Sequence, residues 1–209
     1  MSKLKGVGVI GTIVSLLVVL AVIHGPLTAF ADQTEDRSGR VEIAVLGQYQ
    51  GSTNITSNSL GATEKFGSIT SGGLQVGYNI NDHFNVNMDL YDGTTSLRVT
   101  VLDGVPISNA PSVNFNTFAM EWNLDYNVLK TPITPVASGG VGFVNFTGSS
   151  HGFTASETHF IGNLGGGLRW DISKSFYLRA LYRWTWFKLD DANSTTNISG
   201  PMLSIGYKF

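Results

Sequence analysis

The sequence predicts an all-β protein: an eight-stranded antiparallel up-and-down transmembrane β-barrel, preceded by a cleavable signal peptide. Three observations predict it. Apolar and polar residues alternate with period two through most of the chain, which is typical of strands with two different faces. Only 13% of the 209 residues are charged, against about 25% in soluble proteins. Short polar connections alternate with long loops rich in Ser, Thr, Asn and Gly, as in membrane barrels.

The first 31 residues have the composition of a signal peptide. Lys3 and Lys5 stand before an apolar run at 7–23, and Ala29 and Ala31 form the small-x-small pattern that precedes a cleavage site. The alternative is a retained membrane anchor, for which the apolar run is somewhat short. We therefore predict an exported protein with a signal peptide at 1–31, a short periplasmic lead at 32–39 and a barrel at 40–209.

Eight segments of the mature chain are expected to be strands. The clearest lies at 118–128, where large apolar residues occupy every second position and Ala, Glu, Asn or Asp stands between them. A strand separates these two sets completely, whereas a helix would mix them. The predicted strands are Val41–Gln50, Ser71–Ile80, Phe84–Tyr91, Phe118–Val128, Ile133–Phe146, Thr158–Trp170, Phe176–Trp186 and Met202–Phe209.

The connections between these strands alternate in length. The tight polar ones, expected to be periplasmic turns, lie at 81–83, 130–132 and 173–175. The long ones, expected to be extracellular loops, lie at about 51–68, 93–112, 148–157 and 190–200. In the second long loop Leu97, Val99 and Val101 alternate with polar residues, which predicts a hairpin that protrudes above the membrane. In the alternative, this hairpin also spans the membrane and the barrel has ten strands.

The two faces of the strands decide which side of the barrel meets lipid. A soluble, lipocalin-like barrel is apolar inside and polar outside, whereas a membrane barrel is the reverse. Here the apolar face carries many aromatic residues near strand ends, which suit membrane–water interfaces and would make a soluble protein aggregate. We therefore predict an outward aromatic girdle made of Trp122, Tyr126, Trp170, Phe176, Tyr182, Trp184, Trp186 and Tyr207.

The opposite face carries charges of both signs. Its acids stand on the first, third and fourth predicted strands and its bases on the sixth, seventh and eighth. Because buried charges need partners, we expect an ion-pair network across the lumen, with Glu42 and Lys208 on the strands that close the ring. The alternative is that these charges are solvated in a small water-filled lumen. The predicted network consists of Glu42, Asp89, Glu121, Asp125, Arg169, Arg179, Arg183 and Lys208.

Four parts of the sequence together carry a family resemblance: the signal peptide, the hairpins GGLQVGYNI-ND-HFNVNMDL and GNLGGGLRWDI-SKSFYLRALYRWTW, and the terminal SIGYKF. With these parts the chain resembles the eight-stranded outer-membrane β-barrel superfamily of OmpA-like transmembrane domains, OmpX-like proteins and porin-like barrels. The resemblance implies an integral bacterial outer-membrane protein in contact with outer-membrane lipid and lipopolysaccharide. It also implies that the barrel-assembly machinery reads the last strand, through Leu203, Ile205, Tyr207 and Phe209.

One loop, SSHGFTASETHF, contains residue types that a hydrolase uses: Ser150, His151, Ser156, Glu157 and His159. Some eight-stranded outer-membrane barrels deacylate lipid A, and their motif places His and Ser two residues apart on a strand. Here Phe153 and Ile161 stand two residues after the histidines, so the motif does not fit. We predict that the chain is not an enzyme, with a lipid A hydrolase as the remote alternative, and we predict no metal site and no cofactor.

The sequence favours a structural and surface-interaction role carried by the long extracellular loops. A formal net charge of −2 indicates no nucleic-acid partner. The exposed edge of a protruding hairpin at 93–112 is a candidate site for a surface ligand. The alternative from a different class is a narrow, porin-like channel for small solutes. A monomer is expected, although the sequence names neither a ligand nor an oligomeric state.

Overall fold

The computed structural model describes residues 36–57, 62–102, 105–107, 112–150, 153–188 and 195–209, and these residues form strands, turns and extended segments. The predicted signal peptide, with Ala29 and Ala31, lies outside them and stays a prediction. No helix in the described residues is long and apolar enough to cross a membrane. The strands are β1 (Val41–Gln50), β2 (Thr53–Ser57), β3 (Ala62–Phe66), β4 (Ile69–Asn79), β5 (Phe84–Leu102), β6 (Val105–Pro106), β7 (Ser112–Asn127), β8 (Ile133–Ser150), β9 (Phe153–Asp171), β10 (Phe176–Phe187) and β11 (Thr196–Lys208).

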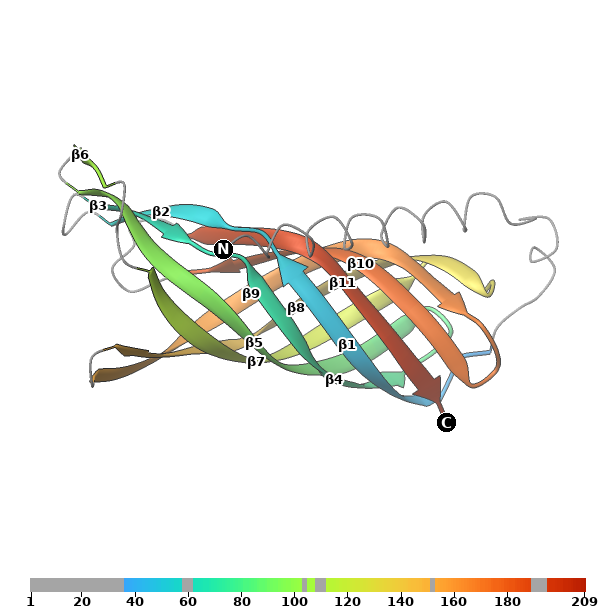
Figure 1. Cartoon of the computed structure of the whole chain (residues 1–209). Coiled ribbons are helices and arrows are strands. Elements are labelled where there is room, and N and C mark those ends of the chain that lie inside the picture. The colour runs from blue at the N-terminus through green and yellow to red at the C-terminus, as the bar shows by residue number, and fades with distance from the viewer. Residues whose placement is uncertain (1–35, 58–61, 103–104, 108–111, 151–152, 189–194) are drawn as a thin grey trace, which may run out of the picture. The chain divides into compact units, whose positions relative to one another are not determined.

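Eight of these strands close into a barrel (Figure 1). The ring runs β1-β4-β5-β7-β8-β9-β10-β11 and returns to β1, and each neighbouring pair is antiparallel. The predicted eight-stranded up-and-down barrel is therefore confirmed, and each predicted strand overlaps one of these eight, although three of them end one residue earlier than predicted. The ten-stranded alternative is wrong, because β6 is two residues long and pairs only with β5 among the described residues.

The strands continue beyond the segments that the sequence pattern predicts. β5 has 19 residues, β8 has 18 and β9 has 19. Consequently, much of what was expected to be loop at 93–112 and 148–157 is paired strand. The prediction stopped where the apolar alternation stopped, because an outward face needs apolar residues only where it meets lipid.

The first long loop also differs from expectation. Residues 51–68 contain β2 and β3, which extend the β1–β4 hairpin in an unchanged register, with Gln50 opposite Ile69 and Thr53 opposite Phe66. β3 then pairs with β5 from Leu97 to Val101. The predicted protruding hairpin is present, since β5 pairs with β7 as far as Arg98 and Ser112. However, the edge that was expected to be exposed is covered by β3, because the first hairpin rises equally high.

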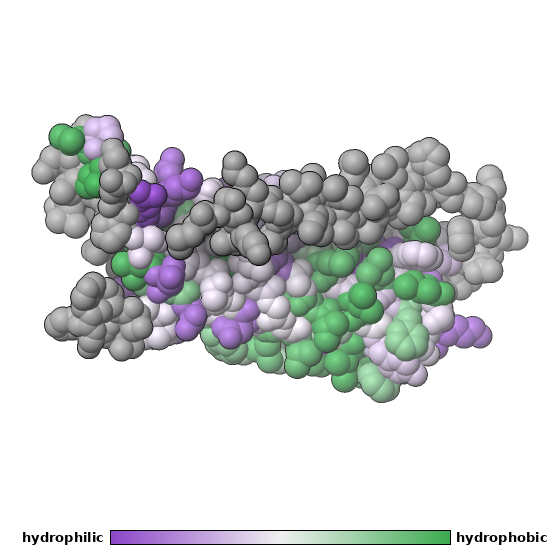
Figure 2. Space-filling model, viewed as in Figure 1, coloured by the Kyte–Doolittle hydropathy of each residue, from purple (hydrophilic) through white to green (hydrophobic). Residues whose placement is uncertain are grey.

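Residues alternate between the outside and the lumen along every spanning strand. In β1, for example, Ile43 and Val45 are exposed while Glu42, Ala44 and Leu46 are buried. Figure 2 shows apolar residues gathered over the half of the barrel near the C-terminus and polar residues toward the end that carries β3 and β6. This band is the expected lipid-facing surface of a membrane barrel.

The upper limit of the apolar band is sharp on the β8–β9 hairpin. Outward-facing Phe143 and Phe160 pack edge to face, with ring centroids 5.7 Å apart. Two residues further along each strand, the amide of Asn145 donates to the hydroxyl of Thr158 at 2.9 Å. Aromatic packing thus gives way to hydrogen-bonded polar side chains within one step of the strand, and the strands continue above this limit into the aqueous side.

Candidate functional site in the barrel lumen

The eight charged residues predicted to face the lumen are all buried inside the barrel. β1 places Glu42, β5 places Asp89, β7 places Glu121 and Asp125, and the basic residues come from β9, β10 and β11. Their alternation with outward apolar residues puts them on the inner face. The structure therefore brings together, in one enclosed space, side chains from the first and the last strand of the ring.

At the centre of the lumen one guanidinium holds two carboxylates. Arg183 is fully buried, and its Nη1 donates to Glu121 Oε2 at 2.6 Å while its Nη2 donates to Asp89 Oδ2 at 2.9 Å. The hydroxyl of Tyr91 donates to the other oxygen of Glu121. Asn163 also donates to Glu121, at 2.9 Å. Closer to the periplasmic end, Arg179 binds Asp125.

A second cluster lies at the periplasmic end of the lumen. Arg169 donates to Glu42 Oε1 at 2.6 Å and to Asp171 Oδ1 at 3.0 Å. Glu42 and Lys208 are opposite each other in the register that closes the barrel, as expected. The ammonium of Lys208, however, donates to Asp171 at 2.8 Å. Asp171 is thus the shared acceptor of this cluster, a role that the sequence analysis did not assign to it.

Two charged residues of the lumen were missed by the sequence analysis. Asp171 stands two positions after Arg169, so the alternation with period two places it on the inner face. This pattern could have identified Asp171 as a lumen residue. Arg37 lies before the first strand, where no periodicity exists, yet its side chain is fully buried against Asp171. With these two residues, five carboxylates and five cations are buried in the lumen among the residues that the structure describes. The acids are Glu42, Asp89, Glu121, Asp125 and Asp171, and the bases are Arg37, Arg169, Arg179, Arg183 and Lys208.

Tyr177 packs against this cluster. Its ring lies under the guanidinium of Arg169, whose Cζ is 4.3 Å from the ring centroid. It lies against Gly206, its partner on β11. A Cβ atom added at Gly206 would come within 2.4 Å of the ring. The glycine in the terminal SIGYKF therefore makes room for an aromatic ring in the lumen.

Substituting Gly206 by alanine is expected to lower the free energy of unfolding by about 1–3 kcal/mol, the usual effect of overpacking. The added methyl group must displace the Tyr177 ring from its place beneath Arg169. Urea unfolding in lipid vesicles measures the loss. In a Tyr177→Ala background the same substitution should have much less effect, and an equal loss in both backgrounds would contradict this interpretation.

The extracellular half of the lumen is largely apolar, with a few buried polar side chains such as Gln50 and His159, in contrast to the polar interior that was expected. The rings of Phe66, Phe146 and Phe187 contact one another with centroids 5.7–5.8 Å apart, and we call these three residues the aromatic cap. Buried aliphatic residues surround the cap, among them Ile55, Ile69, Ile161 and Ile198. A lumen that holds no water column can be filled by apolar packing as well as by ion pairs, so alternation alone does not fix its polarity.

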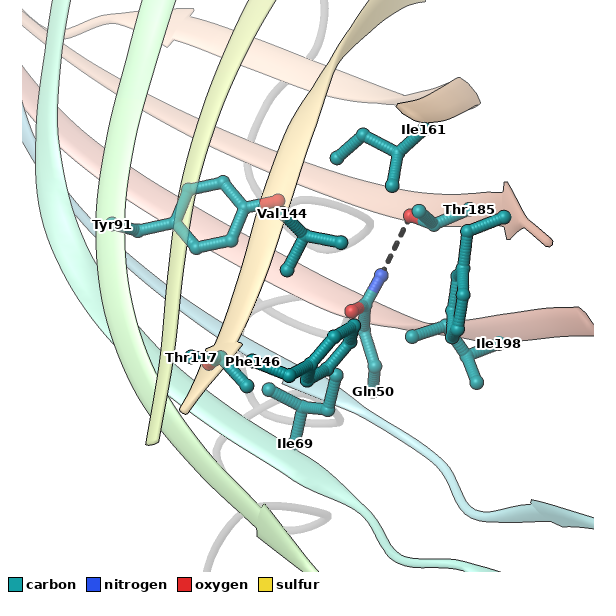
Figure 3. A pocket seen from close by; sticks show the side chains of 10 residues that line it. Gln50, Ile69, Tyr91, Thr117, Val144, Phe146, Ile161, Thr185 and Ile198 are labelled. Carbon is teal, nitrogen blue, oxygen red and sulfur yellow. Dashed lines mark hydrogen bonds between the residues drawn. The ribbon is translucent and has the colours of Figure 1, made fainter. Parts of the chain in front are cut away.

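The ten charged residues given above are called the charged layer. A small cavity lies on the inner side of the aromatic cap (Figure 3), where Tyr91, which bonds to Glu121 of the charged layer, also lines it. Gln50 reaches across it and donates to Thr185 Oγ1 at 2.7 Å, while Tyr91 approaches from the opposite side. The space open to the centre of a water molecule in this cavity is about 20 Å³. This is room for one or two waters. In the described residues the lumen is therefore filled by side chains at both ends.

The residues of the predicted aromatic girdle all lie on the outer face. Trp186 is half-buried and the other seven are exposed. Several pack in edge-to-face pairs, including Phe176 with Tyr207 and Tyr182 with Trp184. The predicted assembly-signal residues Leu203, Ile205, Tyr207 and Phe209 also face outward. Contact of the girdle with lipid interfaces and recognition of the last strand stay predictions.

Among the candidate hydrolase residues that the structure describes, Glu157 and His159 come together, but Ser156 does not join them. Ser156 lies on the outer face, where its hydroxyl is bonded to Asn145. His159 is buried on the inner face beside Phe146, with Glu157 Oε2 3.4 Å from its Nε2. His151 lies outside the described residues, and the side-chain position of Ser150 is not described. The described residues also contain no group of three or more His, Cys, Asp or Glu side chains that could hold a metal ion.

A closed antiparallel barrel with an apolar outer band and a paired, charged interior defines an integral membrane β-barrel. The sequence matches the family model described as "Outer membrane protein beta-barrel domain" over residues 15–209. The chain therefore belongs to this family and is an integral protein of the bacterial outer membrane. Comparison with curated proteins gives no significant match.

Solved structures of similar fold support this assignment. OprG of Pseudomonas aeruginosa is 14% identical, with a TM-score of 0.52 over 85% of this chain and 99% of that one. Neisserial surface protein A is 18% identical, with a TM-score of 0.51 over 82% and 96%. Ail of Yersinia pestis, solved with a heparin analogue, is 17% identical, with a TM-score of 0.50 over 82% and 99%. At these identities the likeness is one of fold.

Proposed function

We propose that this protein is a non-conducting outer-membrane barrel that stabilises the membrane and presents its extracellular hairpins as an interaction surface. The observation that carries the proposal is the filled lumen. Among the described residues, the charged layer occupies the centre and the periplasmic end of the lumen with five acids and five bases, and the aromatic cap occupies its extracellular end. A continuous water path for solutes would have to break both layers.

The height of the strands supports a role on the cell surface. β8 and β9 continue beyond the apolar band, and their outward side chains there are polar and hydrogen-bonded. Barrel walls extended in this way hold the loop tips away from the lipid. Lipopolysaccharide around these walls and the assembly machinery at the last strand are the partners that we propose, together with a surface ligand at the tips.

A narrow channel is the alternative from another class, and one observation favours it. Several buried lumen atoms have no hydrogen-bond partner in the protein, among them the hydroxyls of Ser138 and Ser204 and the side-chain amide of Gln48. Buried polar atoms of this kind are usually satisfied by water. The lumen would then hold isolated waters, which a channel could join into a path.

A lipid A hydrolase is a more remote alternative, and the mass of lipid A before and after expression tests it.

Conductance in planar lipid bilayers separates the two main functions. The purified protein is expected to insert without discrete current steps in molar salt, because neither layer of the lumen leaves a path for ions. Heat-modifiable gel migration of the same sample shows that the barrel is folded. Reproducible single-channel steps from folded protein would overturn the proposal and favour the channel.

The surface role is tested at the tip of the β5–β7 hairpin. Deleting Leu97–Pro106 should reduce attachment of cells that display the protein to host-cell layers. Because Leu97 pairs with Phe66, the deletion can disturb the first hairpin. The exposed tip residue Val105 therefore offers a milder variant, Val105→Asp. Unchanged attachment with both variants, each correctly folded, would count against a binding surface at this hairpin.

A further inference from the structure

The short lead before β1 inserts one side chain into the periplasmic mouth of the barrel. Arg37 is fully buried, and all three nitrogens of its guanidinium are bonded. Nε donates to Asp171 Oδ2 at 2.8 Å, and Nη2 lies 2.7 Å from the same oxygen. Nη2 also donates to the carbonyl of Thr131 at 2.7 Å, and Nη1 donates to those of Leu129 at 3.1 Å and Asp82 at 3.4 Å.

The acceptors that surround Arg37 come from three separate places at this end of the barrel. Asp82 lies in the turn between β4 and β5, Leu129 and Thr131 lie in the turn between β7 and β8, and Asp171 ends β9. Only a side chain in the middle of the mouth can reach all three. Arg37 therefore contacts the β4–β5 turn, the β7–β8 turn and the end of β9 through a single side chain.

These acceptors are held in place by contacts that do not involve Arg37. The N–H of Leu129 donates to Thr134 Oγ1 at 2.8 Å, and the hydroxyl of Thr131 donates to the carbonyl of Ile133 at 2.6 Å. Asp171 is bonded independently by Arg169 and Lys208. The acceptors therefore form a preorganised site that should persist when the Arg37 side chain is absent.

The backbone of the lead is fastened to the same rim. The N–H of Arg37 donates to Asp82 Oδ1 at 3.0 Å, and that of Gly39 donates to the carbonyl of Asn79 at 2.9 Å. Gly39 has a φ of 74°, in the left-handed region that favours glycine, and this lets the chain turn from β1 into the mouth. Lys130 and the backbone N–H groups of Arg37 and Ser38 hold the pKa of Asp82 below its usual value, so it is ionised at neutral pH.

The acceptor set matches one chemical class of cation. Five contacts converge on a planar group from several directions, and a guanidinium has five N–H donors in a fixed fork. An ammonium has three donors on a single atom and cannot reach the same carbonyls from one position. The site therefore selects by the shape of the donor as well as by its charge.

We propose that the periplasmic mouth of this barrel is a guanidinium-binding site, filled in cis by Arg37, and that its occupation seals the lower lumen. When the Arg37 side chain is removed, the site accepts a small guanidinium compound from solution. This binding site is separate from the surface role proposed above, and neither depends on the other.

Chemical rescue tests the site. Arg37→Ala should lower the unfolding midpoint in detergent, and millimolar methylguanidinium should restore it, whereas methylammonium at equal concentration and ionic strength should not. Methylguanidinium should not change the unfolding midpoint of the parent protein, because Arg37 already fills its site. Arg40→Ala is the matched control, because Arg40 lies in the same lead and its guanidinium forms no hydrogen bond or ion pair with the described residues. No rescue, or equal rescue by the two cations, would overturn the site.

Sealing is tested with an introduced thiol, which is unique because the chain has no cysteine. Ser204→Cys places it in the lumen at a hydroxyl that has no protein partner. A small charged thiol reagent should label it at least about tenfold faster in Arg37→Ala than in the parent, the factor expected for one lost charge-assisted hydrogen bond. Methylguanidinium should slow the labelling again. Arg37→Lys should also label faster than the parent, and equal labelling rates for the parent, Arg37→Lys and Arg37→Ala would refute sealing.

Discussion

Replacing Arg183 by methionine is expected to lower the free energy of unfolding by about 3–5 kcal/mol, the range for removing one partner of a buried ion pair. Arg183 binds both Glu121 and Asp89, and all three side chains are fully buried. The substitution keeps much of the apolar volume but leaves two carboxylates without their cation in a closed lumen. Urea unfolding in lipid vesicles, followed by tryptophan fluorescence, measures the change.

Two further substitutions at the same site should reverse the loss of stability. Adding Glu121→Gln and Asp89→Asn to Arg183→Met removes the uncompensated charges and should recover most of the lost stability, because neutral amides of similar shape can bond to each other. Lys174→Met, at an exposed turn residue, is the control and should change little. A loss below about 1 kcal/mol for Arg183→Met would resemble an exposed pair and would mean that water reaches the centre of the lumen.

Replacing Phe187 by alanine is expected to lower the free energy of unfolding by about 3–5 kcal/mol, as for other buried aromatic residues. The Phe187 ring contacts both other rings of the aromatic cap and lines the small cavity beneath it. Phe187→Leu, which keeps much of the volume, should cost less than about 1.5 kcal/mol. The same unfolding assay compares the two variants.

Loss of the cap should not create a channel. The charged layer still fills the centre and the periplasmic end of the lumen in Phe187→Ala, so bilayer recordings should show no current steps. If Phe187→Ala conducts while Arg183 and its partners are intact, the charged layer is permeable to ions and the cap alone closes the barrel.

The membrane-spanning part of the fold was predictable because one rule governs it. Each residue between the two interfaces faces either lipid or lumen, so the alternation in segments such as 118–128 gives the strand, its orientation and its inward charges together. The same rule fails above the membrane. β2, β3 and the upper parts of β8 and β9 have outward Asn, Thr and Ser residues, and the pattern that marks a strand in lipid is absent there.

The lumen was predictable in part, for a related reason. Alternation shows which residues face inward, but the choice of partner depends on the position of each strand around the ring and on side-chain reach. Lys208 stands opposite Glu42 in register, yet its ammonium binds Asp171. Arg37 carries no local signal, because its burial results from a turn at Gly39 and from acceptors up to 134 positions away. The aromatic cap combines rings from β3, β8 and β10, which only the closed ring brings together.

The division of the lumen into an apolar end and an ionic end gives the barrel two opposite responses to temperature. Apolar packing weakens on cooling. The desolvation penalty of buried ion pairs falls on warming, so the charged layer gains relative strength as temperature rises. Cold should therefore loosen the extracellular end first, where Phe66, Phe146 and Phe187 meet. The periplasmic end, held by Asp171 and its three cations, should be the last part of the interior to open on heating.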